Sequence, residues 1–275
     1  EYDNFTNTVL NEQGEDVYWA ITHAEGFYRD IFKKFKGSFE RIFMMGVSPV
    51  TLDDLSSGYN IDWNISVDEI FNAMMGFEEA EVREMFRYYQ QNDMLKGDAE
   101  AMITEMKPWY DNYCFARESL GDDRIFNCDM TLYYLRWQVD FHCSPGEMAD
   151  KNIRTDYSKL KMLARIDRDS VQEENRMGTI EEIAAKGEIL VDLHTSFPAE
   201  RVTDIDNFRS LLYYYGLLTM CGTRGDLIKM SIPNNCVREQ YFGFLRDYYQ
   251  KYSSIDLHYL NVMLTDMAYD GRWKP

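Results

Sequence analysis

The chain has 275 residues, of which 45% are hydrophobic, and its 47 acidic and 29 basic side chains give a formal net charge of −18. This length and hydrophobic content predict a globular protein with a substantial core, and the negative charge argues against nucleic acid as a direct partner. The absence of any apolar run of roughly 18 to 20 residues argues against a membrane span, and the five cysteines, without a C-x-x-C pair, are typical of reduced thiols in a cytoplasmic protein rather than of a disulfide framework or a zinc site.

The N-terminal part predicts an amphipathic helix and then a buried strand. Apolar residues recur at helical spacing from Val17 to Phe35, and a basic turn with Gly37 predicts the helix end. Residues 42–47 form a continuous apolar run, typical of a strand inside a mostly parallel sheet. Such a strand needs neighbours, and no similar run lies nearby. Since the chain begins with Glu1 and not with Met, we expect a piece of a longer polypeptide whose preceding part supplies those neighbours.

The next part, residues 61–163, predicts a helical domain. Val82, Met85, Phe86 and Tyr89 form an apolar stripe at helical spacing, and a stretch rich in tyrosine and tryptophan follows.

Within this domain, an aromatic group lies around one acidic residue. Asp111, followed by Asn112, lies among the rings of Trp109, Tyr110, Tyr113 and Phe115. Two interpretations stay open: the rings pack a rigid loop between two helices, or the loop contacts a bound nucleotide or a moving neighbouring domain.

Residues 164–252 change character and predict a winged-helix-like module. A helix precedes a second helix at 208–215 that ends at Gly216, and two strands then flank a turn from Gly222 to Gly225. An amphipathic helix from Val237 to Tyr248 follows, and residues 253–275 predict a last helix that serves as a linker. The whole pattern predicts a mainly α fold with a minor β component.

Common catalytic motifs are missing from the sequence. It contains neither G-x-x-x-x-G-K-[ST] nor G-x-G-x-x-G, so this chain cannot cradle the phosphates of a nucleotide by those routes. G-x-S-x-G and H-E-x-x-H are also missing, and the four histidines lie in unrelated contexts.

Several segments together resemble one family. In chain order they are RIFMMGVSPVTLDDLSSGYNI, GFEEAEV, WYDNYCF, IFNCDMTLYYL, DKNIRTDY, SLLYYYGLLT and SIPN. They are similar, from Glu1 to about Tyr248, to the AAA-ATPase-like family of Bacteroidetes and related bacteria. In that family a P-loop NTPase core and a helical lid usually precede a C-terminal PD-(D/E)XK nuclease domain. The resemblance implies that residues 1–60 are the rear part of an α/β P-loop core after the Walker B motif, that 61–163 are the lid, and that 253–275 lead toward the nuclease.

The resemblance also implies roles for individual residues. Glu1 would match the Walker B glutamate that polarises the attacking water, with Asp3 on the same turn as a contact to nucleotide or lid. Ser48, the first polar residue after the strand at 42–47, would be a sensor of the nucleotide phosphate. The alternatives are that Glu1 and Asp3 only begin a helix and that Ser48 and Pro49 only end the strand in a turn.

The family resemblance leads to an expected function. ATP and Mg²⁺ would be ligands of the parent protein, with none tightly bound to this chain. The phosphate loop, the Walker B aspartate and the nuclease signature are missing, so this chain alone should neither hydrolyse ATP nor cut DNA. We expect it to couple ATP binding or hydrolysis to an attached effector, a nuclease; the alternative is a non-enzymatic protein-interaction or regulatory module.

Overall fold

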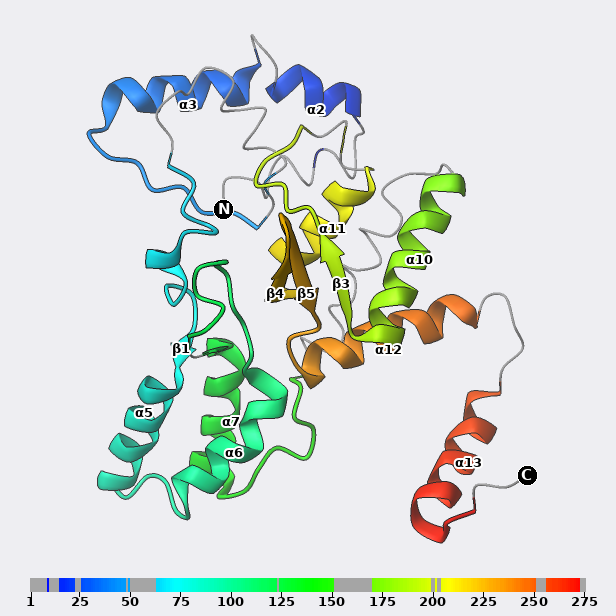
Figure 1. Ribbon diagram of the computed structural model, residues 1–275. Helices are drawn as coiled ribbons and strands as arrows, with labels where there is room; N and C mark the ends of the chain where they lie inside the picture. The colour runs from blue at the N-terminus through cyan, green and yellow to red at the C-terminus, as the bar shows by residue number, and fades with distance from the viewer. Residues whose placement is uncertain are drawn as a thin grey trace.

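A computed structural model describes residues 9, 15–22, 26–47, 49, 63–122, 124–150, 170–198, 201, 204–250 and 256–272. These residues are mainly helical and carry two small antiparallel sheets (Figure 1), which confirms the predicted fold class at this level. In these ranges, every helix is too short or too polar to cross a membrane. The domain boundaries predicted after residues 60, 163 and 252 all fall outside the described residues and stay predictions.

The first packed part, which we call the helical unit, holds α5, α6 and α7 together. It contains η1 (Glu69–Phe71), β1 (Phe77–Glu78), α5 (Glu79–Gln91), α6 (Ala99–Tyr110), β2 (Ile125–Phe126) and α7 (Cys128–Phe141). Val82 and Phe86, from the predicted apolar stripe, are fully buried and pack against α6 and α7. Each helix begins at a polar cap: Glu78 and Glu81 form a capping box for α5, and the side chains of Asp98 and Asn127 cap α6 and α7.

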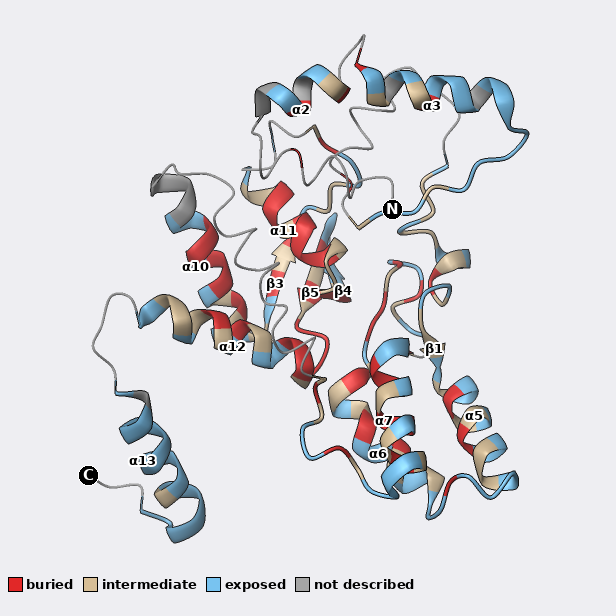
Figure 2. Cartoon of the chain, turned by 180° about the vertical axis from the view of Figure 1, so that it is seen from behind, coloured by how far each residue is buried: buried red, intermediate tan, exposed pale blue. Residues whose placement is uncertain are grey.

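The second packed part, the α/β unit, surrounds a three-stranded antiparallel sheet. It contains α10 (Ser170–Lys186), β3 (Glu188–Val191), α11 (Ile205–Tyr214), β4 (Thr219–Arg224), β5 (Leu227–Ser231) and α12 (Asn235–Tyr249). The strand order is β3-β5-β4, and helices α10, α11 and α12 supply most of the buried side chains around the sheet (Figure 2). The predicted hairpin and its flanking helices are present, whereas β3 is a strand that the sequence analysis missed.

Two glycines fix the chain direction in the α/β unit. Gly216 follows α11 with φ +71° and Gly225 forms the β4–β5 turn with φ +63°, a left-handed backbone that favours glycine. The predicted helix end at Gly216 is confirmed. Gly222, predicted in the turn, lies instead within β4 beside a bulge.

The N-terminal helix predicted as one element is two. The helices are α2 (Glu15–Thr22) and α3 (Phe27–Ser38), and the prediction is wrong because Gly26 adopts an extended backbone at the start of α3. Gly37 lies within α3, which ends at Ser38. The backbone amide of Phe39 then donates a hydrogen bond to the carbonyl of Phe35. Tyr18 of α2 is fully buried in the core of the α/β unit.

The buried strand predicted at residues 42–47 is not formed. These residues have no regular secondary structure, and Ile42, Phe43 and Met45 are 39%, 64% and 52% exposed. A strand must pair its backbone N–H and C=O groups with a neighbour, and no described strand pairs with this segment. An apolar composition alone does not supply a ladder partner, so the strand is absent here; its formation beside strands from a preceding part of the polypeptide stays a prediction.

The last helix, α13 (Leu257–Asp270), lies apart from both units (Figure 1). Asp256 caps it by accepting a hydrogen bond from the amide of Tyr259 at 3.1 Å, and Gly271 ends it with φ +64°. This agrees with the last helix that was predicted within residues 253–275. Its large apolar side chains are exposed; they include Tyr259, Leu260, Val262, Met263, Leu264, Met267 and Tyr269.

Gly76 offers a test of the close packing between β1 and β2. A Cβ atom on Gly76 would overlap Cγ2 of Ile125 and lie 2.8 Å from the carbonyl oxygen of Phe126. We predict that Gly76→Ala lowers the free energy of unfolding by about 1 to 3 kcal/mol through overpacking. The matched control Gly121→Ala, whose Cβ would meet no atom within 4 Å, should change it by less than about 0.5 kcal/mol. Urea unfolding followed by circular dichroism measures both, and equal effects would contradict the packing described here.

Candidate functional site

The two units are joined by residues 111–117, which we call the junction strap. The strap leaves the end of α6 and runs along the outer edge of β4. There the amide of Met220 donates to the carbonyl of Cys114 at 3.3 Å, and the amide of Cys114 donates to Oγ1 of Thr219 at 2.8 Å. The hydroxyl of Tyr213 on α11 adds a bond to the carbonyl of Phe115 at 2.8 Å. The strap therefore covers an edge strand of the α/β unit, whose backbone groups would otherwise lack partners.

The same strap is hydrogen-bonded to the helical unit. Tyr113 and Ile125 exchange two backbone bonds, at 3.1 and 3.0 Å. The side-chain oxygen of Asn72, a buried residue, accepts from the amides of Phe115 and Ala116 at 2.7 and 3.1 Å. Because its partners lie in both units, the strap fixes how the units meet.

Two asparagines complete the junction. Asn112 has φ +86°, a conformation that non-glycine residues rarely adopt, and its Nδ2 donates to the carbonyl of Pro233 at 2.8 Å. In return Nδ2 of Asn234 donates to the carbonyl of Asp111 at 3.3 Å, while its Oδ1 caps α12 by accepting from the amide of Val237. The strained backbone of Asn112 is thus held by side-chain bonds across the junction.

The structure separates the four residues predicted around the aromatic loop. Tyr110 is buried in the core of the helical unit, and its hydroxyl donates to the carbonyl of Met148 at 2.6 Å. Asp111 ends α6 and accepts a bond from the amide of Asn112 at 2.5 Å; burial raises the pKa of its carboxyl. Trp109 and Tyr113 line a cavity at the junction. The interpretation as a rigid packed loop fits Tyr110, whereas contact with a nucleotide stays a prediction for all four.

Three other predicted site residues, Glu1, Asp3 and Ser48, lie outside the described residues. Their proposed roles as a Walker B-like glutamate, a nucleotide or lid contact and a sensor stay predictions. No cluster of three or more histidine, cysteine, aspartate or glutamate side chains that could hold a metal ion occurs among the residues with described positions.

The cavity at the junction has a volume of about 280 Å³ and both units contribute to its walls. Its lining comprises Met75, Trp109, Tyr113, Phe115, Ile125, Phe126, Asn127, Cys128, Met130, Tyr215, Gly216, Leu217, Asn234, Cys236, Val237 and Gln240. None of these residues carries a formal charge at neutral pH, although 28% of the chain is charged. The walls are therefore aromatic and aliphatic, with carboxamide, hydroxyl and thiol groups as their polar parts.

Burial keeps two ionisable groups of the cavity lining neutral. It raises the pKa of the Tyr113 phenol to about 12, although hydrogen bonding with the side chains of Asn234 and Asn127 acts in the opposite direction. Burial likewise raises the pKa of the Cys236 thiol to about 12. Near pH 7 both groups are protonated, so Tyr113 and Cys236 can offer hydrogen bonds and carry no charge.

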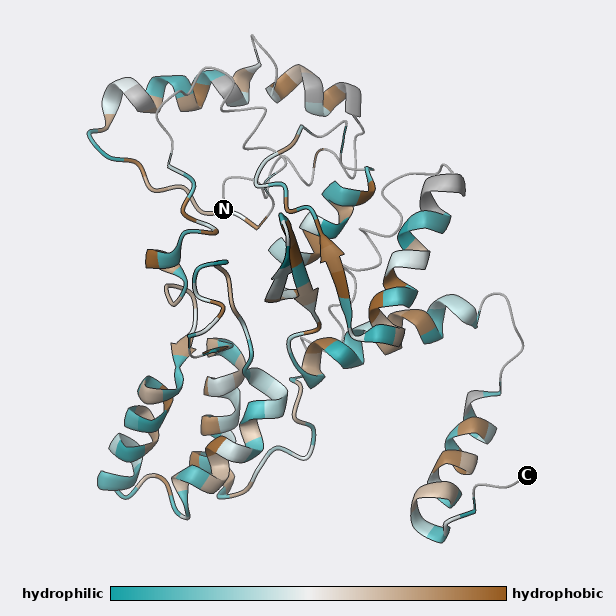
Figure 3. Ribbon diagram, viewed as in Figure 1, coloured by the Kyte–Doolittle hydropathy of each residue, from teal (hydrophilic) through white to brown (hydrophobic). Residues whose placement is uncertain are grey.

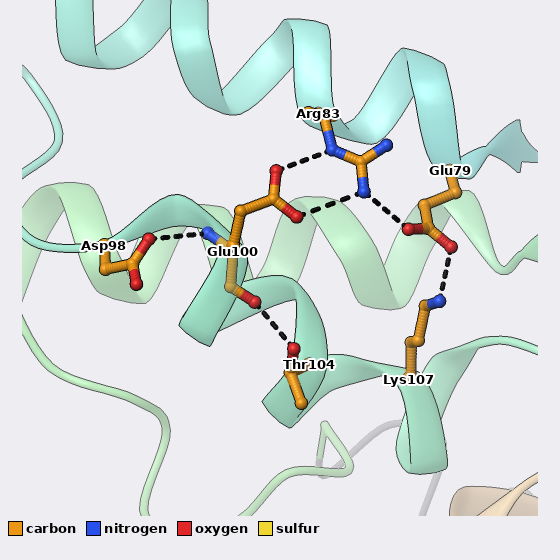
Figure 4. Close-up of polar contacts among 6 residues, drawn as sticks. All are labelled: Glu79, Arg83, Asp98, Glu100, Thr104 and Lys107. Carbon is orange, nitrogen blue, oxygen red and sulfur yellow. Dashed lines mark hydrogen bonds and ion pairs between the residues drawn. The ribbon is translucent and has the colours of Figure 1, made fainter.

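A charged network ties α5 to α6 in the helical unit (Figure 4). Nε and Nη2 of Arg83 donate to the two carboxylate oxygens of Glu100 at 2.6 and 3.1 Å, and Nη2 also reaches Glu79 at 2.6 Å. Lys107 pairs with the other oxygen of Glu79. The Lys107 hydrogen bond is the chief reason that the pKa of Glu79 is lowered; Arg83 adds to it, and partial burial opposes it. Since each charge here has a partner, we interpret this network as structural.

The hydrogen bonds of the asparagines that build the junction were not predicted from the sequence. Asn72, Asn112 and Asn234 act through carboxamide bonds to backbone groups far away in the sequence. Only Asn234 gave a usable signal, because an asparagine directly before an amphipathic pattern is a common helix cap.

Comparisons with known proteins add no family assignment. No protein-family model, no curated protein and no solved structure matches this chain. The resemblance to AAA-ATPase-like proteins therefore stays a prediction.

Asn72 offers a test of the strap. Asn72→Ala removes the acceptor for two strap amides, and we predict that it lowers the free energy of unfolding by about 2 to 3 kcal/mol. It should also speed hydrogen exchange at the amides of Phe115 and Ala116. Asn92→Ala, which removes one exposed side-chain bond to Tyr88, should change stability by about 0.5 kcal/mol or less. Unchanged exchange at the two strap amides would rule out the role given to Asn72.

Glu79 offers a pH test of the charged network. Its folded-state pKa is lowered, so its contribution to stability is present above the pKa of the unfolded carboxyl and is lost as the pH falls through the folded value. Glu79→Gln should therefore cost less than about 1 kcal/mol at pH 7. The difference from the parent chain should disappear in acid. Urea unfolding between pH 7 and pH 2 measures this; Glu118→Gln, at an exposed position, is the control. A deficit that persists at the acid end would contradict the ion-pair explanation.

Proposed function

We propose that this chain is the rear part of an AAA-like P-loop ATPase and that it transmits the nucleotide state of that core to an attached effector. The core would come from the preceding part of the same polypeptide and bind ATP with Mg²⁺. A nuclease following this chain would be the effector. The phosphate-binding loop is lacking here, so ATP would be held by core residues rather than by this chain, whose part would be conformational.

One observation carries the proposal: an amphipathic helix leads into an apolar run that lacks a sheet. Three aromatic rings at the end of α3 lie in a row. The ring centroids of Phe32 and Phe35 are 5.8 Å apart, and those of Phe35 and Phe39, the residue after the helix, are 5.6 Å apart. Residues 42–47 then continue with exposed apolar side chains. Exposed contiguous apolar surface is rare on isolated proteins and marks a place of contact. A helix followed by a strand-length apolar run is what one α/β unit of a P-loop sheet would contribute.

The order of elements in the α/β unit supports the winged-helix-like part of the proposal. Helix α10 leads into β3, helix α11 leads into the β4–β5 hairpin, and β3 pairs with β5 rather than with β4. This is the order expected for a small helical module with a hairpin wing. The hairpin offers only Arg224 and Lys229 as basic side chains, and Lys229 pairs with Glu188 at 2.7 Å. Protein contacts, rather than phosphate contacts, suit such a surface.

Within the proposed ATPase, three residues would act near the nucleotide. Glu1 would orient the attacking water, Ser48 would hydrogen-bond the terminal phosphate or that water, and Asp3 would contact nucleotide or lid. A change in the position of Trp109 and Tyr113 would be transmitted to the α/β unit through the strap.

The test begins with the coding sequence upstream of Glu1, which should encode an apolar strand, a phosphate loop and a closing aspartate. In the extended protein we predict that ATP with Mg²⁺ binds in calorimetry at millimolar nucleotide. Backbone amides of residues 42–47 should exchange hydrogen slowly in the extended protein and rapidly in the 275-residue chain, because sheet hydrogen bonds protect them only in the extended protein.

Ser48→Ala in the extended protein should reduce the rate of ATP hydrolysis by about tenfold or more through loss of a transition-state hydrogen bond, whereas the surface control Ser38→Ala should not. Failure to bind ATP would end the proposal.

A second candidate function is a protein-interaction module without nucleotide dependence. The exposed apolar side chains of α13 favour it, since a helix that is apolar on several sides is normally covered (Figure 3). In the same extended protein, absence of a phosphate loop together with unchanged exchange at residues 42–47 would favour this candidate.

A further inference from the structure

The junction cavity has walls from both units. Trp109 comes from α6, and Asn127 and Cys128 come from the start of α7. From the α/β unit, the turn at Gly216 and Gln240 on α12 also line the cavity. A molecule in this cavity would contact both units at once.

The chemistry of the walls restricts what can occupy the cavity. Five of the sixteen lining residues are aromatic, and the rings of Tyr113 and Phe115 are stacked with centroids 5.8 Å apart and planes at 13°. An ionised ligand would be desolvated without a counter-charge, which costs several kcal/mol. Nucleotide phosphates and carboxylates are therefore disfavoured. A flat uncharged ring suits faces of this kind, because aromatic surfaces pack well in offset or edge-on contact.

Carboxamides supply the polar contacts that would orient such a ring. Asn234 already uses its side chain for the strap and for α12. The half-buried carboxamide of Gln240, by contrast, makes no side-chain hydrogen bond with the residues that the structure describes. This carboxamide can both donate and accept hydrogen bonds. A heterocycle with a ring nitrogen needs a donor, and one with an amide substituent can use both.

We propose that the junction cavity binds a small, planar, uncharged heteroaromatic molecule and that binding strengthens the contact between the helical and α/β units. The volume of about 280 Å³ lies at the lower end of ligand sites, which suits one or two fused rings rather than a whole nucleotide. The ligand binds only the joined arrangement, so it stabilises the junction by mass action. This site is independent of the proposed ATPase core, and its test needs no added nucleotide.

The experiment uses nicotinamide, adenine and indole as uncharged probes. Nicotinate, which has the same ring as nicotinamide but an ionised carboxylate, is the control for charge. Cys128 lines the cavity and is exposed, whereas Cys143, also exposed, does not line it. Iodoacetamide labelling of the 275-residue chain, read by mass spectrometry, reports both thiols together. At ten times its Kd an uncharged probe should slow labelling of Cys128 about tenfold, because only about one molecule in eleven is unoccupied. Cys143 should be unaffected, and nicotinate should protect neither thiol.

A matched pair of variants locates the bound probe. Gln240→Leu keeps the size of the side chain and removes its hydrogen bonds, so the Kd of nicotinamide should rise about fivefold. Gln250→Leu, at an exposed position at the end of the same helix, should leave it unchanged. The proposal is overturned if none of the three uncharged probes protects Cys128 up to its solubility limit, which would make the cavity a packing void. It is also overturned if nicotinate protects as well as nicotinamide, or if Gln240→Leu binds like the parent chain.

Discussion

Hydrogen bonding of the junction strap, residues 111–117, holds the two packed units in one arrangement. The units have distinct buried clusters: one surrounds α5, α6 and α7, and the other surrounds the three-stranded sheet. Cys236 of α12 belongs to the first cluster, so direct packing also joins the units. The strap begins directly after Tyr110 in the first cluster and places Cys114 in the second. A typical internal hydrogen bond contributes only about 0.5 to 1.5 kcal/mol, but an unpaired buried group costs more. The net stability from each single hydrogen bond of the strap is therefore small. Releasing the strap is costly because several buried donors and acceptors would lose their partners at the same time.

This constraint also creates the candidate site. Arg124 donates from Nη1 to the carbonyl of Met220 at 3.0 Å, and Arg117 donates from Nη2 to the carbonyl of Gly225 at 3.0 Å. These bonds bring both ends of β4 against the segment between α6 and α7. Trp109, Tyr113 and the turn at Gly216 then line the same cavity, and the hydroxyl of Tyr113 donates to the carbonyl of Gly216 at 3.4 Å. The cavity is thus a property of how the units meet, and a change in the strap would change its shape. For that reason a ligand there and the strap would act on the same equilibrium.

The sequence predicted the elements whose signals are local. The stripe containing Val82 and Phe86 and the stop at Gly216 were found because each depends on neighbouring residues. Strand β3 was missed because it is short and takes its identity from pairing with the distant β5. The run at 42–47 failed for the complementary reason: its composition is that of a strand, but strand structure requires a partner. At the site, the aromatic residues were found by type, whereas the asparagine bonds were not. Asp111 and Asn234, for example, are joined across 123 positions.

Two of the regions with exposed apolar side chains, residues 27–45 and α13, differ in charge. Residues 27–45 contain five basic and two acidic side chains in a chain of net charge −18, whereas α13 has two acidic side chains and no lysine or arginine. A partner surface that complements residues 27–45 would carry negative charge, whereas one that complements α13 would carry little negative charge. A single uniform surface on a partner therefore does not suit both regions. The surfaces are better explained by two different contacts, one before the helical unit in the chain and one after the α/β unit. The strap between them provides the mechanical continuity through which an event at one contact would reach the other.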